Sequence, residues 1–207
     1  RDIFPTLDWW YRLLRDPGRE SYAVAVHERD VAEPRLVIIG VYPDVVLCEA
    51  DSPAVAFVEP HPDAPGRARA RLLPITTGSL HDTPQVLVEG PAGGVKIERC
   101  SIRRFIKVGH GVRSPRVWRL FDTARPDSQA MYTPAPVHDP DLVDVALLDG
   151  KAVLVQATNE NEQWHIDVSE FTDDRAQEQR RVATGQGEVR HVIGGDGSVL
   201  VHVNRTD

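Results

Sequence analysis

The hydrophobic and polar positions of this chain fall mostly into short apolar runs separated by turn residues. Residues 36–42 form a continuous apolar run, and the shorter runs 45–48 and 54–58 are bounded by Pro-Asp and Ser-Pro pairs. Short apolar runs between such turn residues are typical of β-strands. We therefore predict a mainly β protein, in which residues 36–42 form a strand buried on both faces.

Alternation of polar and apolar residues indicates further strands. Residues 21–27 alternate, and Arg67, Arg69 and Arg71 alternate with alanines. Because successive side chains of a strand point to opposite faces, these three arginines would project from one face. The same reading predicts further strands at 72–76, 85–89 and 95–106.

The N-terminal residues show a helical period instead. Four apolar side chains recur at the spacing i, i+3, i+4, i+7, namely Leu7, Trp10, Tyr11 and Leu14. Thr6 can cap a helix that begins there, and Pro17-Gly18 would end it. This pattern predicts one N-terminal amphipathic helix. We interpret its aromatic cluster as core and not as a surface for stacking sugars.

Two hairpins are predicted towards the C-terminus. The first joins the runs 142–148 and 152–158 through Asp149-Gly150, and the second joins 189–193 and 199–203 through a glycine-rich turn. Asp-Gly suits the positive φ angles of a tight two-residue turn.

The polar stretch 126–140 contains four prolines and is predicted to be a linker or a long loop. It divides the chain into a β-rich unit at 1–125 and a hairpin-rich unit at 141–207, unless both belong to one continuous domain. Residues 172–181 are polar all round, which predicts a surface turn or loop.

A weak internal repeat leaves the architecture open. Three similar segments align on Val117, Trp164 and Val199, which lie 47 and 35 residues apart. These spacings bracket the period of about 40–45 residues that is typical of propeller blades. The first half of the chain shows no matching period. A propeller-like arrangement of antiparallel sheets and a β-sandwich or open barrel therefore both remain as alternatives.

Charge is unevenly distributed along the chain. The net charge of −7 combines −4 over residues 1–58, +6 over 59–121 and −9 over 122–207. Within 99–121 there is no Asp or Glu, and seven residues are basic. A cluster of arginines can attract phosphates, nucleic acid or an acidic protein. Neutralisation of the basic middle by the acidic C-terminal third, within the fold or across a dimer, is the alternative.

The cysteines and the basic residues bear on the source and the location of the protein. Cys48 and Cys100 do not form a metal-type pair, and two cysteines are too few for a disulfide scaffold. We interpret them as buried thiols of a cytoplasmic protein, with a Cys48–Cys100 bridge as the alternative.

Arg exceeds Lys by 21 to 3, which indicates a bacterial source. No apolar run approaches the length of a membrane span, so we expect a soluble protein.

One metal pattern occurs in the sequence. His61 and Asp63 have the His-x-Asp spacing of a non-haem iron site, and His110 could complete its facial triad. The same spacing recurs at His165 and Asp167, so the pattern arises easily in this chain. Neither a glycine-rich phosphate loop nor a Gly-x-Ser-x-Gly elbow is present. We therefore predict no cofactor, and we keep these three residues as weak metal candidates.

We expect a non-enzymatic binding or scaffolding module, either a component of a larger assembly or a domain of a longer chain. Its docking surface is predicted to contain five arginines, namely Arg103, Arg104, Arg113, Arg116 and Arg119. A protein partner or self-association is expected. Binding of nucleic acid or a phosphate ligand through the same segment is the first alternative. A non-haem iron β-barrel oxygenase is the second.

Overall fold

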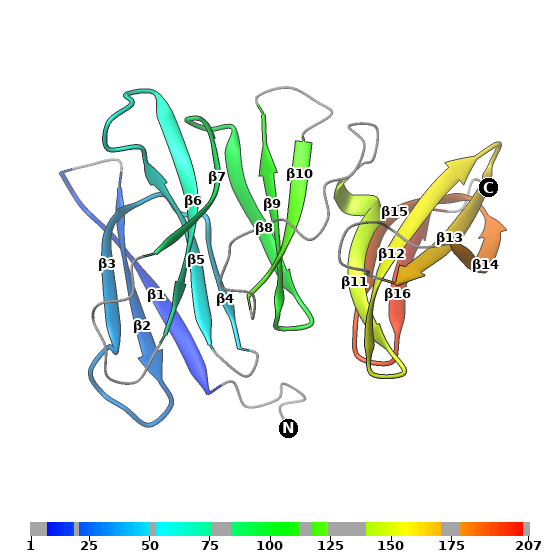
Figure 1. The fold of residues 1–207 in the computed structure, drawn as a ribbon, viewed down its shortest axis with the longest axis horizontal. Coiled ribbons are helices and arrows are strands. Elements are labelled where there is room, and N and C mark those ends of the chain that lie inside the picture. Colours follow the sequence, from blue (N-terminus) through cyan, green and yellow to red (C-terminus); the bar gives the residue numbers. More distant parts are fainter. Residues whose placement is uncertain are drawn as a thin grey trace.

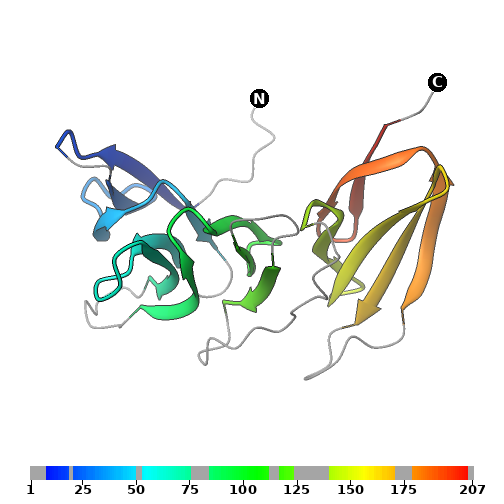
Figure 2. The same cartoon turned by 90° about the horizontal axis from the view of Figure 1, so that it is seen from above.

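The computed structural model describes residues 8–18, 21–49, 53–75, 84–111, 117–123, 140–170 and 179–204. These residues form five antiparallel β-sheets. In Figure 1 the first four follow one another in chain order from left to right, and the fifth, in red, overlaps the fourth. Figure 2, seen from above, shows the fifth sheet alongside the fourth. Every strand pairs with its neighbours in the sequence, so each sheet is a simple meander. The predicted mainly β class is confirmed.

The strands have the following bounds. The first sheet contains β1 (Trp9–Arg15), β2 (Tyr22–Glu28) and β3 (Leu36–Val41). The second contains β4 (Val45–Cys48), β5 (Ala54–Pro60), β6 (Arg67–Pro74) and β7 (Gln85–Pro91). The third contains β8 (Val95–Ser101), β9 (Phe105–His110) and β10 (Val117–Asp122). The fourth contains β11 (Val143–Leu148), β12 (Lys151–Glu160), β13 (Gln163–Glu170) and β14 (Arg180–Gln186), and it follows a short 3₁₀ turn, η1 (Pro140–Leu142). The fifth contains β15 (Glu188–Gly194) and β16 (Val199–Asn204).

A structural period underlies this succession. The second to fifth sheets begin at Val45, Val95, Val143 and Glu188, so their first strands start 45 to 50 residues apart. Of the three segments aligned in the sequence, those at Val117 and Trp164 are both third strands, β10 and β13. The segment at Val199 is a second strand, β16, which explains its shorter spacing. The sequence repeat was therefore real for two of its three members.

The apolar core lies between neighbouring sheets. A separate cluster of buried side chains fills each of the four junctions. Representative members are Phe57 between the first and second sheets, Ile106 between the second and third, Trp118 between the third and fourth, and Val155 between the fourth and fifth. Each sheet is thus stabilised by the next one along the chain.

The predicted N-terminal helix is wrong. Residues 9–15 form β1, which pairs antiparallel with β2 from Trp9 opposite Glu28 to Arg15 opposite Tyr22. In the strand, Trp9 and Tyr11 pack against the core while Trp10 points to the other face. Aromatic residues favour extended structure, and pairing with β2 outweighs the helical spacing. Thr6 and Leu7 lie outside the described residues.

Two strand predictions also need correction. The run at 36–42 forms β3, but one of its faces is open, because Val37 and Ile39 are 53% and 77% exposed. The run at 95–106 is two strands, since the chain turns between β8 and β9 where Ile102 and Arg103 have φ angles of 44° and 62°. This turn contains no Gly, Pro, Asn or Asp, so the usual residues that indicate a turn are missing from it.

Both predicted C-terminal hairpins are confirmed. Asp149 and Gly150 link β11 to β12 with φ angles of 52° and 74°, as a tight two-residue turn requires. The three alternating arginines lie on β6, where the intervening Ala68 and Ala70 are fully buried. Residues 126–139 and 172–178 lie outside the described residues, so the division into units 1–125 and 141–207 stays a prediction.

A disulfide joins the second and third sheets. Cys48 in β4 is bonded to Cys100 in β8, with their Cα atoms 5.8 Å apart, and neither cysteine is a free thiol. The preferred interpretation as two free thiols was wrong, and the alternative is correct. The bond links the first strands of two neighbouring sheets.

The disulfide should contribute strongly to stability. The bonded residues are 52 positions apart, and closing a loop of that length stabilises a fold by about 4 kcal/mol. We expect Cys48→Ala, Cys100→Ala and the double variant to lose about the same free energy of unfolding in urea, because each removes the same bond. Reduced wild-type protein should unfold at a similarly lowered urea concentration. Unchanged unfolding of the wild type after reduction would contradict this assignment.

Candidate functional site

Asp144, in the first strand of the fourth sheet, is a buried carboxylate with three polar partners. Its side chain is only 2% exposed. One carboxylate oxygen accepts a hydrogen bond from Ser101 Oγ of β8. The other accepts from the Gly194 backbone N–H of β15 at 2.8 Å and lies 3.1 Å from Arg99 Nη2. Asp144 therefore connects three consecutive sheets.

Arg99 strengthens this connection. Its Nη2 also donates to the Val192 carbonyl at 2.8 Å, so one guanidinium of β8 reaches both β11 and β15. Gly194 completes the contact, because a Cβ there would overlap the Val145 backbone. The close approach of β15 to β11 thus requires glycine at this position.

Glu49 has a comparable role beside the disulfide. It follows Cys48 directly, and its side chain is only 8% exposed. Its Oε1 accepts from the Trp9 backbone N–H at 2.9 Å, and its Oε2 accepts from Arg103 Nη2 at 2.7 Å. Glu49 of the second sheet therefore contacts both the first and the third sheets.

Lys107 is a buried cation at the junction of the third and fourth sheets. Its side chain is 2% exposed, and Nζ donates to the Val143 carbonyl at 3.0 Å. Glu98 lies 3.5 Å from Nζ, and the Trp118 ring lies 5.7 Å away. Burial is the main cause that lowers the pKa of Lys107, and Arg99 lowers it further while Glu98 opposes both. Such burial suits a structural role better than contact with a substrate.

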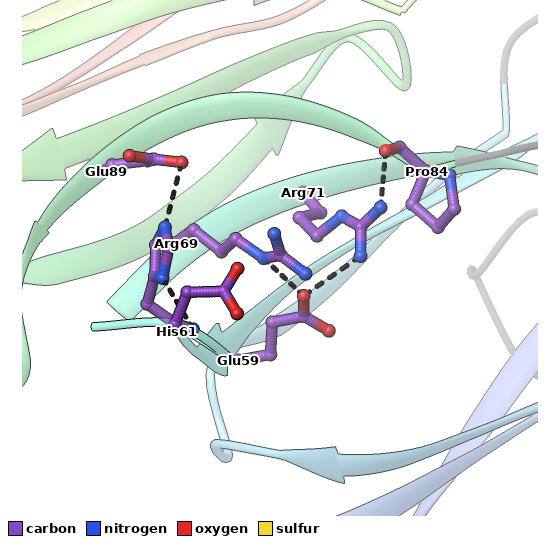
Figure 3. A network of polar contacts seen from close by, with 7 residues as sticks. Glu59, His61, Arg69, Arg71, Pro84 and Glu89 are labelled. Carbon is purple, nitrogen blue, oxygen red and sulfur yellow. Dashed lines mark hydrogen bonds and ion pairs between the residues drawn. The ribbon is translucent and has the colours of Figure 1, made fainter. Parts of the chain in front are cut away.

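A second polar network covers part of the second sheet (Figure 3). Glu59 Oε1 accepts from Arg69 Nε at 2.5 Å and from Arg71 Nη1 at 2.9 Å. Arg71 also donates to the Pro84 carbonyl at 2.7 Å. These three charged side chains are mostly buried, with exposed fractions of 14% to 20%. Two of the alternating arginines thus share one carboxylate.

The predicted docking arginines are only partly described. Arg113 and Arg116 lie outside the described residues. Arg103 occupies the β8–β9 turn and is 52% exposed while paired with Glu49. Arg104 is 44% exposed and makes two hydrogen bonds of 2.6 Å to Asp122. Arg119 lies within β10 at intermediate exposure. The structure therefore brings Arg103 and Arg104 together, each already bound to an acid.

The metal candidates show no assembled site among the residues that the structure describes. His61 Nδ1 accepts from the Asp63 backbone N–H at 3.2 Å, and its Nε2 lies 3.5 Å from Glu89 (Figure 3). His110 ends β9, but its side chain is outside the described part. No group of three His, Cys, Asp or Glu side chains that could hold a metal occurs in the described ranges.

Sequence reasoning missed Asp144, Glu49 and Lys107. Asp144 stands inside the apolar run that begins with Val143, and a charge within such a run is an available signal. Its partners are 43 and 50 residues away, which the sequence does not indicate.

No helix among the described residues is both long and apolar enough to cross a membrane.

The fold resembles known β-propellers. No protein-family model matches the sequence, and no curated protein matches it significantly. Among solved structures, the β-propeller domain of the Trilobed protease from Pyrococcus furiosus is similar with a TM-score of 0.58 and 9% identity. The match covers 96% of this chain and 60% of that one. At this identity the likeness concerns the fold alone, and it favours the propeller-like alternative over the sandwich.

A second structure agrees. The Pyrococcus horikoshii acylaminoacyl peptidase matches 96% of this chain and 34% of its own, with a TM-score of 0.57 and 9% identity. The chain thus spans about three fifths of the first structure and a third of the second. The described sheets are those of a propeller-like module.

Removing the Asp144 carboxylate should destabilise the fold strongly. Asp144→Ala would leave Arg99 and the Gly194 N–H without this buried acceptor, and breaking a buried pair costs about 3–5 kcal/mol. Asp167→Ala is the control, because its partner Arg181 is 56% exposed and such pairs contribute about 1 kcal/mol or less. Urea unfolding of both variants measures the difference. Equal losses would show that Asp144 has no special role.

The lowered pKa of Lys107 predicts a pH dependence of stability. Its pKa in the folded state is below the usual 10.5, so the folded protein releases this proton at a lower pH than the unfolded chain. Lys107 therefore makes folding more favourable as pH rises through that interval. The free energy of unfolding of wild type relative to Lys107→Met should increase as pH approaches 10.5. A constant or falling difference would contradict burial as the main cause.

Proposed function

We propose that this chain is a non-enzymatic propeller module that docks a protein partner within a larger assembly. The observation that carries the proposal is the fold likeness over 96% of the chain to a propeller that is itself one domain of a protease. The roles of the buried charged residues support the non-enzymatic part of this proposal. Asp144, Glu49 and Lys107 bond to neighbouring sheets and so serve the architecture.

The proposed docking surface is centred on the β8–β9 turn. Arg103 and Arg104 lie there at 52% and 44% exposure. Their ion pairs with Glu49 and Asp122 hold both guanidinium groups in position, and a preorganised arginine loses less entropy on binding. A partner that presents carboxylates or backbone carbonyls would suit this surface.

The direct test compares two matched arginines. Arg103 is 52% exposed in the third sheet, and Arg190 is 51% exposed in the fifth, where it pairs with Glu188. We expect Arg103→Ala to weaken the affinity for a partner captured from the source about tenfold, a loss of about 1.4 kcal/mol. Arg190→Ala should leave that affinity unchanged. Equal effects of the two variants, measured by titration calorimetry, would refute the proposed surface.

The same pair of variants tests the nucleic-acid alternative. Binding through phosphates weakens as salt rises, because it releases counterions. Retention of the protein on heparin that falls with salt and is reduced by Arg103→Ala would favour a phosphate ligand over a protein partner. The acidic overall charge of −7 favours the protein partner.

We also propose that the protein resides in an oxidising compartment. A cytoplasmic location was expected from the sequence, but cytosolic reductants keep most thiols reduced. The Cys48–Cys100 bond therefore favours an oxidising compartment. Alkylation of thiols in intact source cells should leave both cysteines unmodified until a reductant is added. Immediate modification would restore the cytoplasmic interpretation.

A further inference from the structure

The first sheet has one face packed and one face open. Trp9 and Tyr11 of β1, with Val24 and Val26 of β2, pack into the cluster shared with the second sheet. The intervening side chains point the other way. Four large apolar residues on this outer side are exposed, namely Trp10 (37%), Leu14 (53%), Val37 (53%) and Ile39 (77%). We call this surface the open face.

The open face extends across three strands and is apolar except at its Trp10 end and at Arg12 of β1, which lies opposite Ala25 with its guanidinium 5.0 Å from the centre of the Trp10 ring. Ala23 of β2 lies opposite both Leu14 of β1 and Ile39 of β3, and Ala25 lies opposite Val37. Small alanines between larger apolar side chains make a shallow sheet surface. The Trp10 ring stacks on His27 with centroids 4.0 Å apart, and these two residues occupy one end of it. Large contiguous apolar patches on a protein surface mark contact sites.

Apart from Arg12 and His27, the open face has the same kinds of side chain as the packed faces. Each of the four junctions between successive sheets is filled by aliphatic and aromatic side chains. Residues 36–41 contain only apolar residues and glycine, which is the pattern of a strand covered on both sides. The sequence of β3 is therefore suited to a neighbour on its outer face.

The fifth sheet, at the other end of the chain of sheets, also exposes apolar side chains. On the fifth sheet, Val189 and Val192 pack against the fourth, whereas Ile193 and Leu200 are paired across the two strands and are 45% and 65% exposed. Both terminal sheets thus present apolar side chains away from the five-sheet stack.

We propose that the open face is covered by a further antiparallel sheet of the same propeller, supplied by polypeptide beyond these 207 residues. Propellers typically close with four to eight sheets, so five leave room for up to three more. The match to the Pyrococcus furiosus propeller domain leaves 40% of that chain uncovered, since 60% is covered. A ring of two copies would need ten sheets and exceeds the usual range. The proposal depends on the fold and not on the docking function.

The experiment uses a single reactive thiol. Because the chain has no free cysteine, Ile39→Cys introduces one on the open face, at its most exposed apolar residue. A maleimide probe should label it rapidly in the 207-residue chain and at least about tenfold more slowly in the natural polypeptide of the source. Val182→Cys, at a residue 46% exposed on β14, is the control and should react equally in both.

Two results would overturn the proposal. One is rapid labelling of Ile39→Cys in the natural polypeptide, including the case in which that polypeptide adds no further sheet. The other is protection that occurs in the 207-residue chain itself and grows with its concentration, because this result would identify a second copy as the occupant. Ile39→Glu provides an independent readout. It should lower the thermal midpoint of the natural polypeptide and leave that of the 207-residue chain unchanged.

Discussion

The face-to-face packing of successive sheets is the interaction on which this structure depends. A sheet of two to four strands cannot bury its own apolar faces, so it is stable only against a neighbour. Each junction has its own cluster, from Phe57 at the first junction to Val155 at the last. Stability therefore accumulates from sheet to sheet along the chain. Interior sheets have two such neighbours, whereas the first and fifth have one within the described residues.

Apolar packing alone would allow the sheets to slide, and directional bonds between first strands oppose this. Strand β8 shows how. Three consecutive residues, Arg99, Cys100 and Ser101, each bond to another sheet, and alternation turns Cys100 to the side opposite its neighbours. Cys100 is bonded to the second sheet, and Arg99 and Ser101 contact Asp144 of the fourth. Buried ion pairs contribute little net stability but penalise wrong arrangements strongly, so these bonds fix the order and the spacing of the sheets.

The sequence allowed the local features to be predicted and not the long-range ones. The Asp149-Gly150 hairpin and the alternation of β6 were correct, because a turn and a strand depend on adjacent residues. The helix was wrong because the spacing of Trp10, Tyr11 and Leu14 also fits a helix, and pairing with β2, the next strand of the chain, outweighs that spacing. The site around Asp144 could not be predicted, since its acceptor atoms meet donors 43 and 50 residues away. Such pairs become visible only when the order of the sheets is known.

The segregation of charge along the chain acquires a structural meaning from these contacts. The basic segment 99–121 has no acidic residue of its own, and two of its described arginines pair with acids elsewhere in the chain, Arg99 with Asp144 and Arg103 with Glu49. At these described arginines, the positive charge of the segment is therefore matched by acids that are distant in the sequence. The open face and the β8–β9 turn therefore suit two different kinds of contact. The apolar open face suits permanent burial, since water contact there is unfavourable, whereas the half-exposed Arg103 stays hydrated and suits a partner that binds and leaves.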